Sequence, residues 1–284
     1  MNGFLIVDKP KGITSMTVCN KIKYSLNLNK TGHNGTLDPN ATGVMVVGVN
    51  KGTKLMKLIN EHDKEYIATI IFGYDSDTLD MEGNITADLP MSFTKIELEN
   101  AILKLKNTKA QIPPMTSAIK VNGKKLYEYQ RKGIEVEVKE RSINIYESEL
   151  VSDIRYAENH IEVDVRLFVS KGFYVRSYAR DLGKLLGGAA VLKELRRTKA
   201  GDYTLANAIE LANICENDII PIEKFFDLPK VEVNDYIAGL VKNGVTLDER
   251  QTKLNGVFYV TNKCDIIAIY ESVSENKHKP ILIF

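Results

Sequence analysis

A glycine-rich loop between residues 32 and 43 carries a carboxylate that is well placed for chemistry. The loop reads Gly32-His33-Asn34-Gly35-Thr36-Leu37-Asp38-Pro39-Asn40-Ala41-Thr42-Gly43. It lacks both the GxxxxGK[ST] pattern of a phosphate-binding loop and the GxGxxG pattern of a dinucleotide-binding turn. The small residues around Asp38 allow a substrate to approach one carboxylate closely. From these residues alone, Asp38 is either a reactive acid or an aspartate that only hydrogen-bonds its own turn.

A second segment supplies an arginine that could pair with this carboxylate. Residues 170–177 read Ser-Lys-Gly-Phe-Tyr-Val-Arg-Ser and lie where an expected strand leads into a helix. Arg176 could form a two-bond fork with Asp38, and its charge would keep the carboxylate ionised in a pocket that otherwise raises a carboxyl pKa. The alternative is an arginine on the solvent face of the helix.

Positive charge is concentrated in three windows although the formal net charge is only +1. Residues 9–30 carry +5, residues 104–132 carry +7 and residues 171–201 carry +6, whereas residues 61–99 carry −8. Tyrosines interleave with the basic residues, and such windows favour a polyanionic partner if they converge on one face. We expect the acidic segment to cover the opposite side. The alternatives are solvated helix faces, or a site for a small anionic metabolite.

Composition excludes several other classes of protein. The 284 residues are 44% hydrophobic and 26% charged, which is typical of a globular chain. The four histidines and three cysteines have no metal-ligand spacing, so we expect no metal, no cofactor and reduced thiols. Apolar runs are too short for a membrane span or a secretory signal, so we expect a cytoplasmic protein.

The elements that position Asp38 and Arg176 can be placed by apolar periodicity and helix caps. Expected strands cover residues 3–8, 44–49, 66–74, 143–150 and 160–170. One expected helix begins at Thr14 or Ser15, and two more run over 53–60 and 96–105. A fourth extends from a Ser177 cap to Gly187-Gly188. Thr94 and Glu97 form a capping box for the helix over 96–105. Residues 29–43 and the acidic stretch to Asp88 read as loops, and 111–141 as a mobile inserted arm.

Several segments of the chain carry distinctive motifs. They are residues 3–15, 32–43 and 63–66, Pro113-Pro114-Met115-x-Ser117-Ala118-x-Lys120, Gly123-Lys124-Lys125-Leu126-Tyr127-Glu128, Ser170-Lys171-Gly172-x-Tyr174-Val175-Arg176 and Leu195-Arg196-Arg197-Thr198. In this order, over nearly the whole chain, they resemble the bacterial TruB family of tRNA pseudouridine-55 synthases. Departures occur at Asn50, Gly52, Phe173 and Ser177, which affect packing more than chemistry.

The resemblance implies a fold and a domain organisation. It implies an α+β pseudouridine-synthase fold, in which helices flank a central mixed, mostly antiparallel sheet. Residues 1–227 would form the catalytic domain with the RNA-binding arm 111–141. Residues 228–284 would form a small RNA-binding β domain that resembles a reduced PUA domain. The implied activity is conversion of uridine-55 in the T stem-loop of tRNA to pseudouridine, without metal or cofactor, by a monomer.

The resemblance also assigns roles to residues. Asp38 would be the catalytic aspartate, Arg176 its ionic partner and Tyr66 the residue stacked on the target base. His33, Lys9, Pro10, Tyr174, Leu195, Lys124 and Lys125 would bind substrate or support the site. Asp38 could add to uracil C6, add to C1′ of the ribose, or remove the C2′ proton, and the sequence leaves these open. The alternative function is a non-catalytic RNA-binding or RNA-folding protein.

Overall fold

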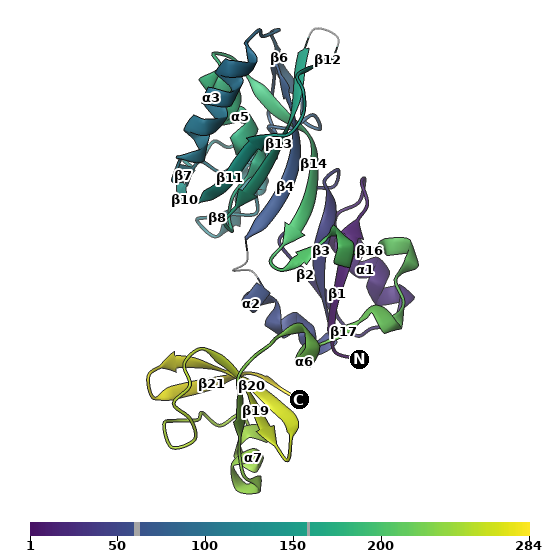
Figure 1. Ribbon diagram of the computed structural model, residues 1–284, viewed down its shortest axis with the longest axis vertical. Helices are drawn as coiled ribbons and strands as arrows, with labels where there is room; N and C mark the ends of the chain where they lie inside the picture. The colour runs from purple at the N-terminus through teal and green to yellow at the C-terminus, as the bar shows by residue number, and fades with distance from the viewer. Residues whose placement is uncertain (60–62, 158–159) are drawn as a thin grey trace.

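Two β-sheets organise the computed structural model, which describes residues 1–59, 63–157 and 160–284. Figure 1 shows a large sheet in the upper part of an elongated molecule and a four-stranded sheet at its lower end. The main path of the large sheet runs β11 (Ile145–Leu150), β13 (His160–Val169), β4 (Lys64–Phe72), β14 (Ala190–Ala200), β3 (Thr42–Val49), β1 (Gly3–Lys9) and β16 (Ile209–Glu210). Most neighbours are antiparallel, but β14 runs parallel to β3 and β16 parallel to β1. The α+β fold with a mixed, mostly antiparallel sheet is confirmed.

Short strands extend this framework. β2 (Thr31–Asn34), β12 (Arg155–Ala157), β15 (Tyr203–Thr204) and β17 (Ile220–Pro221) join the large sheet; β5 (Tyr74–Ser76) pairs with β6 (Ile85–Asp88), β7 (Ala110–Gln111) with β10 (Arg141–Ser142), and β8 (Lys120–Val121) with β9 (Lys124–Lys125). The small sheet contains β18 (Lys230–Glu232), β19 (Val257–Asn262), β20 (Asp265–Ser274) and β21 (Lys277–Ile283).

Helices cover one face of each half of the large sheet. The helices are α1 (Ser15–Ser25), α2 (Met56–Ile59), α3 (Lys95–Lys106), α4 (Leu126–Gln130), α5 (Val175–Leu185), α6 (Ile222–Phe225) and α7 (Asp235–Lys242), and short 3-10 turns lie at Asn50–Leu55, Leu205–Asn207, Leu211–Asn213 and Glu216–Asp218. The apolar stripes of α3 and α5 pack on β4, β11 and β13, while α1 packs on β1 and β3. None of the helices within the described residues is long and apolar enough to cross a membrane.

The strands β1 and β3 are buried on both faces, which explains their nearly continuous apolar sequences. One face contacts α1 through Leu5, Val7, Met45 and Val47. The opposite face, with Phe4 and Val44, packs against α6 and against side chains of the small sheet such as Tyr259. The hydroxyl of Tyr259 donates to the carbonyls of Ile222 at 3.1 Å and Phe226 at 3.0 Å. The small sheet therefore docks on the end of the large one.

Two predicted helices differ from those observed. In place of a helix over 53–60, a 3-10 turn precedes the short α2, while Asn60 lies outside the described residues. The turn lies so close to β1 that a Cβ on Gly52 would be only 2.2 Å from the carbonyl oxygen of Gly3. The Ser177 cap is also wrong, since α5 begins at Val175 and Ser177 is buried in its first turn. The side chain of Gln111 accepts from the Tyr174 N–H at 2.8 Å, so the arm satisfies one backbone donor at the start of the helix.

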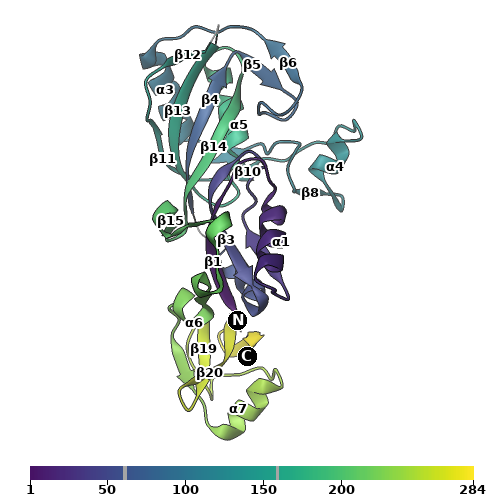
Figure 2. The same cartoon turned by 90° about the vertical axis from the view of Figure 1, so that its right-hand side faces the viewer.

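Three predicted loops contain regular structure. The first part of 29–43 pairs with β3 as β2, and the acidic stretch forms the β5–β6 hairpin. The arm contains the β8–β9 pair and α4, and Leu126 gives it a fully buried apolar contact. Figure 2 shows this arm projecting to the same side of the large sheet as α1. These short strands pair with the next strand along the chain, and segments of two to four residues are too short to show an apolar period.

The close contact between β3 and β14 predicts a strict requirement for glycine at position 43. Gly43 has φ +105°, and an added Cβ would lie 2.1 Å from the carbonyl oxygen of Arg197. We expect Gly43→Ala to lower the free energy of unfolding by about 2–4 kcal/mol, because backbone strain and a backbone clash add.

The matched control is Gly123→Ala, since Gly123 has φ +82° and a Cβ there would have nothing within 4 Å. This control should lose only about 1 kcal/mol. Urea unfolding measures both variants. Equal losses would contradict the proposed clash between β3 and β14.

Candidate active site

A cavity of about 450 Å³ opens beside the loop that carries Asp38. Its volume falls within the range of roughly 300–1,000 Å³ that is typical of small-molecule sites. Five segments line this cavity: the Asp38 loop, β4, β14, the arm and the start of α5. Their lining residues include Asp38, Tyr66, Thr116, Tyr127, Tyr174, Arg176, Leu195 and Arg197. A smaller cavity of about 210 Å³ shares Asp38, Thr116, Arg176 and Leu195 with the first.

The Asp38 loop is fixed through its backbone. The buried hydroxyl of Ser15, at the start of α1, accepts from the Leu37 N–H and donates to the Leu37 carbonyl, both at 2.9 Å. The Ala41 N–H donates to the Asp38 carbonyl at 3.1 Å and closes the turn. These bonds hold the backbone on both sides of Asp38, so its side chain is presented to the cavity in one direction.

A buried lysine also stabilises this loop, through bonds to its backbone carbonyls. The ammonium of Lys9 donates to the carbonyls of Pro10 at 3.0 Å, Pro39 at 2.8 Å and Ala41 at 2.7 Å. Burial lowers the pKa of Lys9 to about 8, an effect that the charge of Asp38 opposes. Lys9 therefore contacts carbonyl oxygens rather than the Asp38 cavity, and its charge favours the ionised form of Asp38.

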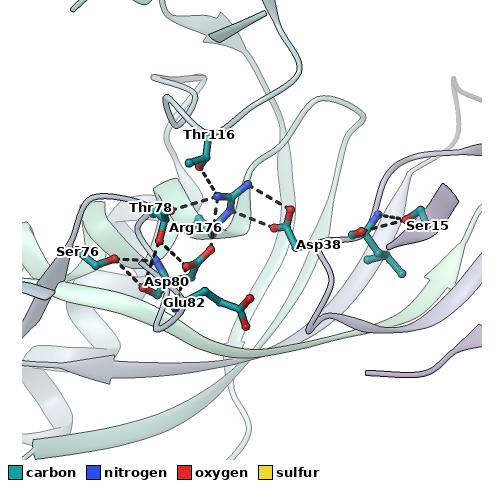
Figure 3. Close-up of polar contacts among 9 residues, drawn as sticks. Ser15, Asp38, Ser76, Thr78, Asp80, Glu82, Thr116 and Arg176 are labelled. Carbon is teal, nitrogen blue, oxygen red and sulfur yellow. Dashed lines mark hydrogen bonds and ion pairs between the residues drawn. The ribbon is translucent and has the colours of Figure 1, made fainter. Parts of the chain in front are cut away.

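Asp38 and Arg176 form the expected two-bond fork. Nε of Arg176 lies 3.1 Å from Oδ2 of Asp38, and Nη2 lies 3.4 Å from Oδ1. The Arg176 side chain is 9% exposed and that of Asp38 is 43% exposed. Figure 3 shows the guanidinium between Asp38 on one side and the β5–β6 hairpin on the other. Arg176 therefore lies in the site and not on the solvent face of α5.

The remaining nitrogen of Arg176 contacts groups that the sequence analysis did not single out. Nη1 donates to the carbonyl of Thr78 at 3.1 Å and to the hydroxyl of Thr116, and it lies 3.5 Å from Oδ2 of Asp80. Asp80 accepts from the Thr78 hydroxyl at 2.5 Å and from the Glu82 N–H at 3.1 Å. The guanidinium thus lies between two carboxylates (Figure 3).

The position of Asp80 corrects the expectation that the acidic segment covers the opposite side of the molecule. The turn that carries Asp80 pairs with β14, since the Met81 N–H donates to the Leu192 carbonyl and the Leu192 N–H to the Leu79 carbonyl, both at 3.1 Å. This pairing brings Asp80, a residue of the acidic segment, close to the positive charge of Arg176.

Opposing effects set the ionisation of Asp38. Burial raises the pKa of Asp38, the Arg176 charge lowers it, the Asp80 charge raises it and the Lys9 charge lowers it, with a net increase. The side chain faces an open cavity, yet the surrounding protein still reduces its hydration. A carboxylate with a raised pKa beside a fixed arginine is suited to a reaction that needs an ionised acid with limited solvation.

An aromatic side chain lines the same cavity as this carboxylate. Tyr66 on β4 is 8% exposed and lines the cavity, with Leu167 and Arg197 as its cross-strand neighbours. Tyr174, the residue before α5, and Leu195 on β14 line the same cavity. Burial raises the pKa of the Tyr174 phenol, which keeps it neutral. The arrangement can hold a flat ring between Tyr66 and the apolar wall.

Comparison with known proteins identifies the family of this chain. Residues 23–175 match the family described as TruB family pseudouridylate synthase (N terminal domain). A tRNA pseudouridine synthase B from Acholeplasma laidlawii is 38% identical over 285 residues, covering 100% of both chains. The chain belongs to the TruB family of pseudouridine synthases. It is therefore an enzyme of the isomerase class.

Other relatives extend the match in sequence and in fold. A tRNA pseudouridine synthase B from Onion yellows phytoplasma is 39% identical over 289 residues, again with 100% of both chains covered. Among solved structures, a chain of a Cbf5-Nop10-Gar1 complex superposes with a TM-score of 0.69 at 24% identity, covering 99% of this chain and 84% of that one. That likeness shows the shared pseudouridine-synthase fold.

The structure brings only some of the predicted site residues together in this TruB-family chain. Pro10 lines a separate cavity with Lys21 and Arg196, and His33 lies on β2 with its buried Nδ1 lacking a hydrogen-bond partner. Lys124 is exposed on the arm, and Lys125 donates to the Tyr127 hydroxyl at 3.3 Å. The two lysines therefore lie outside the Asp38 cavity.

From the sequence, no role was assigned to a buried arginine of this TruB-family site, Arg197. Arg197 is 1% exposed and donates to the carbonyls of Val44 at 2.6 Å and Gly35 at 3.1 Å, so it joins the two ends of the Asp38 loop. The signal was present in the sequence: Arg196 and Arg197 are consecutive residues of a strand, so their side chains point to opposite faces. One of the two had to face the interior.

The raised pKa of Asp38 makes a prediction about stability. Because its folded pKa lies above the unfolded value, ionised Asp38 is less stable in the fold than in the unfolded chain. The cost is absent well below about pH 4, where the carboxyl is protonated in both states; it grows as the pH rises from the unfolded pKa to the folded pKa and is complete above the folded pKa. We expect Asp38→Asn to raise the urea midpoint at pH 7 but not near pH 4.

Asp153→Asn, at an exposed aspartate, is the control and should leave both midpoints unchanged. A lower midpoint for Asp38→Asn at pH 7 would contradict the electrostatic description of the site.

Proposed function

We propose that this chain converts uridine-55 in the T stem-loop of tRNA to pseudouridine. The observation that carries the proposal is the fork between Asp38 and Arg176 at the wall of a cavity also lined by Tyr66. The names of the full-length relatives, tRNA pseudouridine synthase B, support tRNA as the substrate. The reaction breaks the N1–C1′ bond and forms a C5–C1′ bond, while C5 loses a proton and N1 gains one. Atoms and electrons therefore balance without a cofactor.

The target base must leave the RNA stack to reach Asp38. Extruding a base costs a few kcal/mol, which contacts in the pocket and to the backbone offset. Tyr66 stacks on the extruded uracil, while Tyr174 and Leu195 form the rest of the pocket wall. Ionised Asp38, held by Arg176, then starts cleavage of the glycosidic bond. Lys9 and Pro10 support the loop, and His33 contacts RNA from the adjacent strand.

The experiment for this function uses unmodified tRNA transcript and maps pseudouridine in the product. Wild-type protein should modify position 55. Asp38→Asn should bind the transcript with wild-type affinity yet give no product, because backbone bonds that asparagine retains hold the turn, whereas the reaction needs the charge. Binding without product in both proteins would favour a non-catalytic RNA-binding protein instead. Turnover of free mononucleotides would indicate a small-metabolite enzyme.

We expect the hydroxyl of Tyr66 to have a second role, which a substitution can separate from the stacking role of the ring. We expect Tyr66→Phe to bind tRNA normally and to break the glycosidic bond, because the ring still stacks for about 1–3 kcal/mol. It should fail to release the C5 proton, which the phenol oxygen accepts or relays in the wild-type protein.

Tritium release from tRNA labelled at uridine C5 measures this step. Tyr146→Phe, on β11 and outside the cavity, controls for loss of a phenol elsewhere and should release tritium at the wild-type rate. Release at that rate by Tyr66→Phe would leave Tyr66 as a stacking residue only.

The arm lysines predict a change in the salt dependence of binding. Affinity for tRNA should fall by tens to thousands of fold between about 50 and 200 mM salt if several phosphates are neutralised. Replacing Lys124 and Lys125 by Gln should reduce the slope of log affinity against log salt by about 1–2, since each phosphate contact contributes just under one.

Replacing Lys95 and Lys184, exposed lysines on α3 and α5, removes the same charge and should leave the slope unchanged. Equal slopes for the two double variants would exclude a specific contact between arm and backbone. Filter binding at several salt concentrations supplies the data.

A further inference from the structure

The base of the arm is fastened to the first turn of α5, the helix that carries Arg176. Gln111 is 5% exposed, and its amide donates to the Tyr174 carbonyl at 3.0 Å and accepts from the Tyr174 N–H at 2.8 Å. The Ser177 hydroxyl donates to the Ile112 carbonyl at 2.8 Å. These contacts bring residues 110–117 of the arm against the active site.

One side chain of this segment reaches the catalytic pair directly. The Thr116 hydroxyl accepts from Nη1 of Arg176, and Thr116 lines both cavities that Asp38 lines. Figure 3 shows it approaching the guanidinium from the side opposite Asp80. The other acceptors near Nη1, the Thr78 carbonyl and Asp80, belong to the β5–β6 hairpin. Arg176 is therefore held jointly by the hairpin and by the arm.

The geometry of a guanidinium explains why this third contact matters. The group is planar, and its nitrogens point in fixed directions. Nε and Nη2 face Asp38, which leaves Nη1 as the remaining nitrogen that can fix the plane. When Thr116 moves away, only the Thr78 carbonyl and Asp80 still restrain Nη1, so the plane turns toward the hairpin and the two bonds to Asp38 lengthen.

We propose that Thr116 is a positioning residue through which the base of the RNA-binding arm fixes Arg176 against Asp38. The inference rests on the proposed function, since it assumes that the fork serves pseudouridine formation. Thr116 acts through Arg176 and does not touch the reacting atoms. Because Lys124 and Lys125 belong to the same arm, RNA bound by these lysines also keeps Thr116 against Arg176.

The test compares Thr116→Val with wild-type protein on unmodified tRNA transcript. Valine keeps the branched shape of threonine and removes the hydroxyl. The rate of pseudouridine formation at saturating enzyme in a single turnover should fall about 10-fold, as expected for one hydrogen bond to a charged group. The dissociation constant for tRNA should stay within about twofold, and Thr116→Ser should restore the rate. Thr116→Ala, with the same expected loss, replaces valine if that variant folds poorly.

A pH profile separates positioning from packing. Asp38 is faced by Arg176 from α5, by Asp80 and Glu82 from the hairpin, and by Lys9 from β1. A loosened Arg176 lowers the carboxyl pKa less, so the acidic limb of the rate profile should move to higher pH in Thr116→Val. A loss of packing alone lowers the rate without moving this limb.

Ser177→Ala is the matched control, because it removes one bond between the arm base and α5 but no contact to Arg176, and the two Gln111–Tyr174 bonds still fasten the base. Its rate and its acidic limb should match the wild type. Equal losses in the Ser177 and Thr116 variants, weaker tRNA binding by Thr116→Val, failure of serine to restore the rate, or an unmoved acidic limb would each overturn the positioning role. Absence of pseudouridine with wild-type protein would instead overturn the proposed function.

Discussion

The rest of the active site depends on the hydrogen bonds and ion pairs that the guanidinium of Arg176 makes. It donates to Asp38 with two nitrogens and faces Asp80, Thr78 and Thr116 with the third. The four partners come from the loop before β3, the β5–β6 hairpin and the arm, which are far apart in sequence. A guanidinium can join them because it is planar and offers donors in several directions. Each neighbouring segment therefore has to be built so that one polar group reaches Arg176.

Arg176 and Lys9 reduce the cost that burial imposes on a charge at Asp38, but they do not remove it. Burial and Asp80 raise the pKa of Asp38, whereas Arg176 and Lys9 lower it. Lys9 is itself buried among three backbone carbonyls, and Arg197 joins the two ends of the loop through two more. The loop is therefore rigid where it presents the carboxylate. Stability is lost by ionising a partly desolvated acid, a common feature of active sites.

Local patterns in the sequence predicted the elements with strong periodicity or clear caps. The apolar strands β1, β3, β4 and β13 and the Thr94–Glu97 capping box lie where expected, because burial and capping leave marks on neighbouring residues. The fork between Asp38 and Arg176 was also predicted, from residue types and the family resemblance. Asp80 and Thr116 were missed because their contacts depend on pairing between distant segments. Nothing in the acidic stretch distinguishes the inward Asp80 from the exposed Asp77.

The dependence of Asp38 on Arg176 is tested most directly by NMR titration of the Asp38 carboxyl carbon. The titration is performed on the wild-type protein and on Arg176→Gln, which keeps hydrogen-bond donors but removes the charge. The pKa of Asp38 should be higher in the variant, because the main effect that opposes burial has been removed. An unchanged or lower pKa of Asp38 in Arg176→Gln would contradict the role assigned to the ion pair.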